Sequence, residues 1–297
     1  MTRNASARVM IVGKNGQVGQ ELADRAETLA LDFIAFGSNE LDVRNRTAVL
    51  AAVKKYQPTV LINAAAYTAV DKAEEEEELA YAVNRDGVEN LALACKAQNS
   101  LLIHISTDYV FDGSKETAYL ESDQPNPRSV YGASKYAGEE ILQSIWHKHI
   151  IVRVSWVFGV RGSNFVKTML RLANDRDQLS VVNDQFGAPT SARFIAAEIL
   201  RVAGLEGIYG LFHMPSGPYV NWYEFANVIF EEAVDLGLLA IRPKVLPIAS
   251  DQYPTAAERP KNSELSSESG QGGFETCRWR DELILMLKQM RTLQEHS

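Results

Sequence analysis

Three glycines near the start of the chain, Gly13, Gly16 and Gly19, separate an apolar run from a helical pattern. The run at 9–12 is typical of a buried strand, and the apolar residues of 17–28 recur at helical spacing. Glycines at such a junction allow a tight turn, and the first N–H groups of the helix are free to bind a phosphate. The spacing is Gly-x-x-Gly-x-x-Gly, so a plain connection between strand and helix is the alternative. We expect a dinucleotide pyrophosphate here, with contacts from Gly13, Asn15, Gly16, Gln17 and Val18.

Apolar strand patterns alternate with helical patterns through the first half of the chain. Further strands are expected at 31–36, 59–66, 101–107 and 150–158, and helices at 46–56, 79–98 and 130–144. Continuous apolar strands separated by helices predict a parallel sheet that is covered on both faces. The expected fold class is therefore α/β, a Rossmann-like doubly wound parallel sheet with ligands at the carboxyl ends of its strands.

The pattern changes after about residue 160, where loops rich in Asn, Gly and Pro appear. We expect a dinucleotide-binding Rossmann domain over 1–160 and a smaller, interleaved, mostly substrate-binding region over 161–297. One strand near 207–214 is expected to return to the main sheet. The segment 263–273, rich in Ser, Glu and Gly, predicts a mobile loop.

Composition excludes several classes of function. The net charge of −8 argues against nucleic acid, because phosphate binding needs a basic face. Two cysteines in 297 residues suggest a reducing compartment rather than a disulfide framework. No apolar run suits a secretory signal or a membrane span, so a cytoplasmic protein without membrane contact is expected.

Tyr131 and Lys135 stand four residues apart in a predicted helix, so their side chains share a face. A lysine ammonium favours the phenolate and lowers the pKa of a neighbouring tyrosine, which suits proton transfer. Thr107, at the end of the preceding strand, can hydrogen-bond the oxygen of a substrate. This order of elements predicts nicotinamide-dependent chemistry on a hydroxyl or carbonyl group.

Other positions bear on the choice of cofactor and on the core. No acid stands at 36–38, where one would bind the adenosine ribose, so NADPH is favoured mildly over NADH. Asp42 is expected to cap a helix or to contact the adenine. His104 is expected to be a hydrogen-bonded core residue, and the pair Glu139-Glu140 to face solvent. The end of the third strand predicts a flat wall for the cofactor, formed by Ala64, Ala65, Ala66 and Tyr67.

With these residues in view, the chain resembles the extended short-chain dehydrogenase/reductases, and most closely the dTDP-4-dehydrorhamnose reductase family. The resemblance spans about 8–262 and rests on several segments. These are 13–19, 63–74, 106–111, 155–157, 164–169, 183–190 and 259–260.

The resemblance implies reduction of the C4 ketone of dTDP-4-dehydro-β-L-rhamnose by NADPH or NADH. It assigns the catalytic roles to Thr107, Tyr131 and Lys135, with Tyr131 as proton donor and Lys135 also holding the nicotinamide ribose. The nucleotide-sugar substrate is expected to meet Thr107, Asp108, Tyr109, Trp156, Asn183, Gln185, Thr190 and Arg259. Arg259 suits the diphosphate because its planar fork matches phosphate oxygens.

Some members of this family form homodimers bridged by magnesium, which the first and last helices hold through carboxylates. Glu21 fits one such ligand, but 286–290 in the last helix carries no carboxylate, so no metal is expected and magnesium is doubtful. A homodimer stays possible. Two alternatives remain: a non-catalytic NADP-binding regulatory subunit of the methionine adenosyltransferase type, or another nucleotide-sugar epimerase, reductase or dehydratase.

Overall fold

A computed structural model describes residues 8–267 and 273–295. Its centre is a sheet of six parallel strands in the order β10-β5-β4-β3-β1-β2. The strands are β1 (Arg8–Val12), β2 (Asp32–Phe36), β3 (Val60–Asn63), β4 (Leu101–Thr107), β5 (His149–Val154) and β10 (Gly210–His213). The order reverses after β1, and β3 and β4 follow on its other side. The predicted Rossmann-like fold is confirmed.

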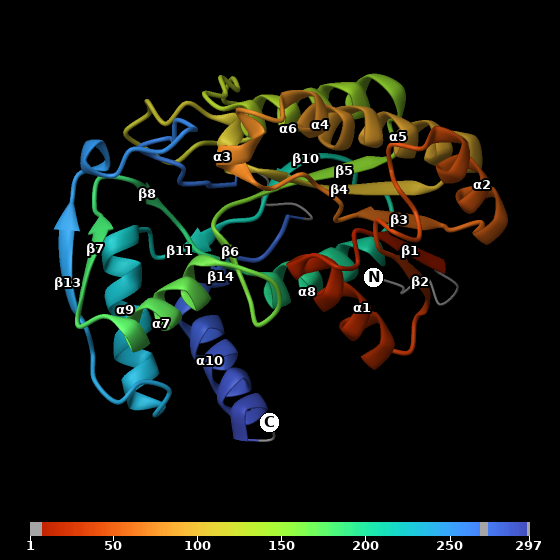
Figure 1. The fold of residues 1–297 in the computed structure, drawn as a ribbon. Helices are drawn as coiled ribbons and strands as arrows, with labels where there is room; N and C mark the ends of the chain where they lie inside the picture. Colours follow the sequence, from red (N-terminus) through yellow and green to blue (C-terminus); the bar gives the residue numbers. More distant parts are fainter. Residues whose placement is uncertain (1–7, 268–272, 296–297) are drawn as a thin grey trace.

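Helices cover both faces of this sheet (Figure 1). One face carries α1 (Gln17–Thr28) and α8 (Ala192–Ala203), which pack on each other over Val9, Ile11 and Ile150. The other carries α2 (Arg46–Tyr56), α3 (Val70–Ala73), α4 (Glu77–Tyr81), η1 (Ala82–Asp86), α5 (Gly87–Gln98) and α6 (Val130–Ile145). Since both faces are covered, the strands are apolar throughout, as the sequence pattern requires.

A second apolar core holds the C-terminal region beside the carboxyl ends of the strands (Figure 1). Its helices are α7 (Phe165–Asp175), α9 (Trp222–Asp235) and α10 (Trp279–Glu295). Short strands pair around them: β6 (Val157–Phe158) with β9 (Thr190–Ser191), β7 (Gln178–Val182) with β13 (Lys244–Ile248), β8 (Phe186–Gly187) with β12 (Val220–Asn221), and β11 (Ser216–Gly217) with β14 (Cys277–Arg278). Two 3-10 turns, η2 (Asp108–Val110) and η3 (Ser250–Gln252), complete the elements.

Three predicted elements differ in detail. The helix expected at 79–98 is α4, a π-helical turn and α5 in succession. The strand expected at 150–158 is broken by Trp156, which has a φ of 44°. In the predicted mobile loop, Ser263 and Ser266 donate backbone hydrogen bonds to Phe186 and Tyr119, while 268–272 lie outside the described residues. No helix in the described part of the chain is long and apolar enough to cross a membrane.

Candidate active site

The glycine turn rests against the end of β3. Gly13 has a φ of 83°, and its N–H donates to the Phe36 carbonyl at 2.9 Å. A Cβ on Gly13 would lie 2.4 Å from the Ala65 nitrogen, so only glycine allows this approach. Gly19 is equally constrained, because a Cβ there would lie 2.1 Å from the Gly13 oxygen.

Gly16 differs from both, because it faces open space. Its φ of −79° suits any residue, and a Cβ would have only the Gly13 oxygen near it, at 3.5 Å. Gly16 is the N-cap of α1, with no side-chain hydrogen bond at the cap. The first N–H groups of this helix are therefore available to an anion, which fits the pyrophosphate of a dinucleotide. Of the other residues expected at the turn, Gln17 accepts a hydrogen bond from Asn164 at 2.9 Å.

An acid that the sequence analysis missed lies at the end of β2. Glu40 folds back to accept the Gly37 N–H at 2.7 Å and pairs with the Lys14 ammonium at 2.7 Å. The hydrogen bond from Lys14 is the main reason that the pKa of Glu40 lies below its usual range. Asp42 pairs with Arg44 at 2.7 Å, and the N-cap of α2 is Asn45 instead. Two cations and two acids, paired with each other, therefore lie where the adenosine end of a dinucleotide is expected.

The wall after β3 is fixed by Asn84, which the sequence analysis also missed. This buried amide accepts the Tyr67 N–H at 2.9 Å and donates to the Tyr67 carbonyl at 3.1 Å. It also donates to the Ser134 hydroxyl on α6 at 3.0 Å. A residue of the π-helical turn thus joins the predicted cofactor wall to the helix that carries Lys135. Ala64, Ala65 and Ala66 are partly exposed along this wall.

Thr107, Tyr131 and Lys135 lie together where β4 meets α6. Thr107 is the last residue of β4, and its hydroxyl accepts the Tyr109 N–H at 3.2 Å. Tyr131 is in the first turn of α6, whose N-cap Ser129 accepts the Gly132 N–H at 3.1 Å. Lys135 is buried, and its Nζ donates to the Ile105 carbonyl at 2.6 Å.

Burial dominates the protonation of this group. It raises the pKa of Tyr131 to about 12, although a hydrogen bond with Thr107 opposes the rise. Burial also lowers the pKa of Lys135 to about 8, and the nearby Glu139 opposes that change. The expectation of a lowered tyrosine pKa is therefore wrong for this arrangement, in which Lys135 bonds to β4. Tyr131 remains a protonated phenol at neutral pH, which is the form that a proton donor needs.

A buried ion pair lies directly behind these residues. Glu139 was expected in solvent, but its side chain is 1% exposed and pairs with Arg153 of β5 at 2.6 Å. A second bond joins Arg153 Nε to Glu139 at 3.0 Å, and the Ser106 hydroxyl also donates to this carboxylate. Arg153 lies 5.0 Å from the centroid of the Phe111 ring. Strands β4 and β5 are thereby tied to α6 one turn beyond Lys135.

Asp108 and Tyr109 follow Thr107 on the substrate side. Asp108 is 2% exposed, accepts the Thr107 hydroxyl through Oδ1 at 3.0 Å, and has a pKa raised by burial to about 6. Among the described residues, its Oδ2 atom has no hydrogen-bond partner. Tyr109 meets Tyr131 edge to face, with ring centroids 5.6 Å apart. A hydrogen bond with Ser263 opposes the rise in the pKa of Asp108, so a ligand hydroxyl at Oδ2 would share this carboxyl group with Ser263.

The C-terminal region brings the remaining predicted residues to different depths. Trp156 stacks on Trp222 with the ring centroids 3.4 Å apart, and a Cβ on Gly187 would lie 2.6 Å from the Trp156 ring. Asn183 is exposed and Gln185 is partly exposed. Thr190 is fully buried, where β9 pairs with β6.

Arg259 reaches across to the first half of the chain. It forms a two-pronged pair with Asp71 in α3, at 3.1 and 2.7 Å. The hydrogen bond from Arg259 is the main reason that the pKa of Asp71 is lowered. Asp71 lies within 63–74, a segment of the family resemblance, but the sequence alone indicates no role for it. This pair fixes the guanidinium beside the wall that follows β3.

The last helix carries no carboxylate at 286–290, as stated from the sequence, but its first turn places Glu282 near Glu21. Helix α10 begins at Trp279, and Glu282 in its first turn contributes to the raised pKa of Glu21, which burial raises most. Arg193 of α8 pairs with Glu282 at 2.5 and 3.0 Å. Over 8–267 and 273–295, no three His, Cys, Asp or Glu side chains are grouped as a metal site would require.

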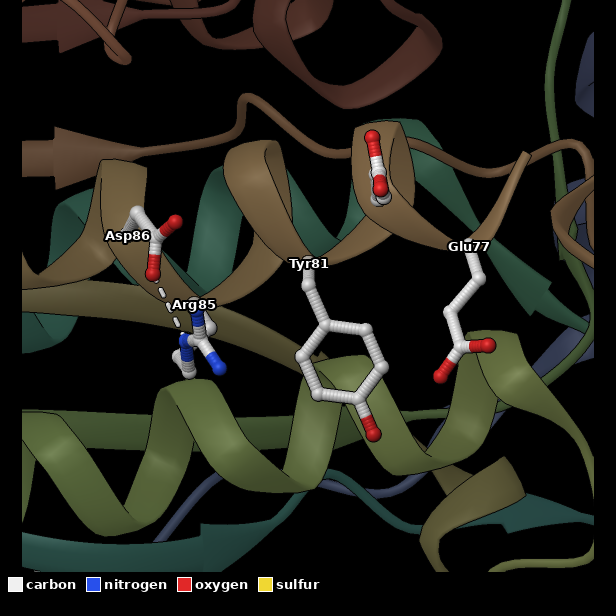
Figure 2. Close-up of a pocket in the computed structure, with 5 residues that line it drawn as sticks. Glu77, Tyr81, Arg85 and Asp86 are labelled. Carbon is white, nitrogen blue, oxygen red and sulfur yellow. Dashed lines mark hydrogen bonds and ion pairs between the residues drawn. The ribbon is translucent and has the colours of Figure 1, made fainter.

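A separate hollow of about 410 Å³ lies on α4 and η1 (Figure 2). Its lining side chains are Glu77, Glu78, Tyr81, Arg85 and Asp86. Arg85 pairs with Asp86 at 2.6 Å and lies 5.2 Å from the centroid of the Tyr81 ring. None of these residues belongs to the site described above, and Glu77 and Glu78 are exposed.

The model of the RmlD substrate binding domain matches residues 7–292 of this chain. The dTDP-4-dehydrorhamnose reductase of Aggregatibacter actinomycetemcomitans is 47% identical over 279 residues, which cover 90% of this chain and 93% of the relative. The enzyme of the same name from Escherichia coli K12 is 43% identical over 274 residues, or 90% of this chain and 91% of the relative.

Solved structures give the same result. A dTDP-4-dehydrorhamnose reductase from Clostridium acetobutylicum has a TM-score of 0.90 and 37% identity, with 96% of this chain and 99% of that chain covered. The reductase of Bacillus anthracis in complex with NADP has a TM-score of 0.88 and 37% identity, with the same coverage. A UDP-glucose 4-epimerase from Thermus thermophilus, at 19% identity, shares the fold.

Proposed function

The chain belongs to the family of the RmlD substrate binding domain, and we propose that Thr107, Tyr131 and Lys135 carry out its reaction. It is an NAD(P)H-dependent oxidoreductase that reduces the C4 ketone of dTDP-4-dehydro-β-L-rhamnose, giving dTDP-L-rhamnose. The observation that carries the residue assignment is the position of the Tyr131 phenol beside Thr107, at the carboxyl end of the central strand β4.

The cofactor suits the residues of the glycine turn. The uncapped start of α1 would hold the pyrophosphate, and the wall of Ala64, Ala65 and Ala66 would lie along the nicotinamide half. The mild preference for NADPH rests on the lack of an acid at 36–38, and a 2′-phosphate would share the Lys14 ammonium with Glu40. Reduced nicotinamide supplies the hydride when it is bound.

Tyr131 donates its proton to the C4 oxygen as negative charge develops there. The Thr107 hydroxyl hydrogen-bonds the same oxygen and holds it within reach of the phenol. The Lys135 ammonium stabilises the phenolate that remains. Three side chains thus supply the proton, the orientation and the counter-charge, and all three are held by β4 and α6.

The substrate is bound by groups on both sides of the site. Oδ2 of Asp108 accepts a sugar hydroxyl, and Tyr109 and Trp156 provide flat apolar surface. Arg259, oriented by Asp71, binds the diphosphate. Asn183, Gln185 and Thr190 belong to the same region, and their contacts stay predictions, as do the homodimer and the cytoplasmic location.

Replacing the phenol tests this assignment. Tyr131→Phe should lower turnover by about 10²–10⁴-fold, the usual effect of a lost general acid, with NADPH affinity little changed. Tyr136→Phe is the matched control, because Tyr136 lies on the same helix and packs in a separate cluster around Phe111. A Tyr131→Phe enzyme that keeps more than about a third of its turnover refutes the role of Tyr131. Tight NADPH binding without turnover in the unmodified protein would favour a regulatory subunit instead.

A further inference from the structure

His104 is a buried titratable residue that the mechanism above does not use. It lies in β4 three residues before Thr107 and is fully shielded from solvent. Its two ring nitrogens face different partners: Nδ1 lies 3.0 Å from the Asn63 amide nitrogen, and Nε2 lies 3.4 Å from the Lys135 Nζ. The sequence predicts that His104 is a hydrogen-bonded core residue, and the contact with Lys135 gives His104 a further role.

The direction of each hydrogen bond follows from the backbone of the cofactor wall. The Ala65 N–H donates to Asn63 Oδ1 at 3.0 Å, which fixes the amide so that its NH₂ group points at His104. Nδ1 must then accept, so a neutral imidazole carries its proton on Nε2. That N–H points at Lys135, whose Nζ also donates to the Ile105 carbonyl at 2.6 Å. Lys135 can accept from His104 only as a neutral amine.

We propose that His104 is a positioning residue that holds the neutral form of Lys135 against β4 and so sets how readily Lys135 takes up its charge. The inference rests on the proposed role of Lys135 in the reduction. The chain of hydrogen bonds runs from the cofactor wall at Ala65 through Asn63 and His104 to Lys135. The position of the wall is therefore linked to the lysine that the reaction requires.

The electrostatic surroundings agree with this arrangement. Burial, followed by repulsion from Lys135 and from His149, holds the pKa of His104 well below its usual range, so the ring is neutral. On α6, Glu139 acts on Lys135 and is paired with Arg153 of β5, while η2, which packs on α6, carries Asp108 and Tyr109. Of these, Glu139 favours the charged lysine, while burial favours the amine and brings the pKa of Lys135 to about 8.

Substitution of His104 by Asn or by Gln tests the roles of its two ring nitrogens separately. In His104→Asn the amide sits at the place of Nδ1, so it can still bind Asn63 but cannot reach Lys135. In His104→Gln the amide reaches the place of Nε2 and can still donate to Lys135. Loss of a hydrogen bond to the neutral amine raises the lysine pKa. The alkaline limb of the pH profile of kcat/KM should therefore move up by about 0.5–1 pH unit in His104→Asn and stay in place in His104→Gln.

A purely structural role would reduce activity in His104→Asn without raising that limb. A limb that stays fixed or moves down in His104→Asn therefore overturns the proposal. A downward shift would mean that the imidazole accepts from the lysine ammonium. Thermal melts of both variants show whether each is folded at the pH values used.

A second measurement needs neither variant nor activity. Nitrogen-15 NMR of the histidines in the unmodified protein distinguishes the two neutral tautomers, and His104 should carry its proton on Nε2. A proton on Nδ1, or a charged ring near pH 7, overturns the proposal. This result is independent of turnover, so failure of the tyrosine assignment and failure of the histidine inference are distinguishable.

Discussion

Breaking the buried ion pair behind the active site should destabilise the whole fold. Glu139 and Arg153 are 1% and 2% exposed and are joined by hydrogen bonds of 2.6 and 3.0 Å. In Arg153→Met, the Ser106 hydroxyl of β4 is the only side-chain hydrogen-bond donor that the carboxylate keeps within the described residues. A buried charge left in this way costs about 3–5 kcal/mol of the free energy of unfolding. Urea denaturation followed by tryptophan fluorescence measures this loss.

The double variant Glu139→Met/Arg153→Met provides the decisive comparison. Removing both charges leaves no uncompensated ion, so it should be more stable than Arg153→Met alone. Asp32→Asn is the control, because Asp32 pairs with Arg8 at 3.1 Å while its side chain is 69% exposed, and such surface pairs contribute little. A loss of less than about 1.5 kcal/mol in Arg153→Met would refute this prediction. A double variant whose free energy of unfolding falls by the sum of the two single losses would refute it as well.

Three further predictions concern the cofactor and the metal. Gly16→Val should unfold like the unmodified protein, because a Cβ at Gly16 has its nearest neighbour at 3.5 Å. Calorimetry should nevertheless show that this variant binds NADPH at least about 100-fold more weakly. Gly13→Ala should lose stability instead, because its Cβ would lie 2.4 Å from the Ala65 nitrogen. Unchanged NADPH affinity in Gly16→Val would contradict the pyrophosphate assignment. Ser38→Asp should weaken NADPH more than NADH because of charge repulsion, and unmodified enzyme at least about tenfold better with NADH would refute that preference. Because the Arg193 guanidinium already covers the Glu282 carboxylate, EDTA and magnesium should change neither activity nor the mass measured by light scattering; magnesium-restored activity after EDTA would refute this.

The periodic elements of the first half could be predicted closely from the sequence. Helices α1 and α2 begin and end where the apolar spacing changes, because their boundaries depend on local signals such as the Asn45 cap. The order of strand, glycine turn, strand end and Tyr131/Lys135 helix also predicts which side chains share an edge of the sheet. In a parallel sheet, the residues at the carboxyl ends of neighbouring strands lie along the same edge.

The errors concern contacts between distant residues. Adjacent acids such as Glu139 and Glu140 look alike in sequence, and only Arg153, fourteen positions further on, makes Glu139 a buried residue. The Asp71–Arg259 pair joins residues 188 positions apart, so no local pattern indicates it. The carboxylate of the last helix was missed because α10 begins at Trp279, outside the segment in which a ligand was sought.

The edge strand β10 has a consequence for the synthesis of the chain. Its residues 210–213 pair with β5, although 155–209, with α7 and α8, are translated between the two strands. While the nascent chain ends before β10, the edge of β5 is unpaired, and such an edge is a template for association with other chains. At about 5–20 residues per second, ribosomes expose it for several seconds. Pauses between 160 and 210 should therefore promote aggregation more than pauses after 214, and early-stop fragments should depend on chaperones to remain dispersed.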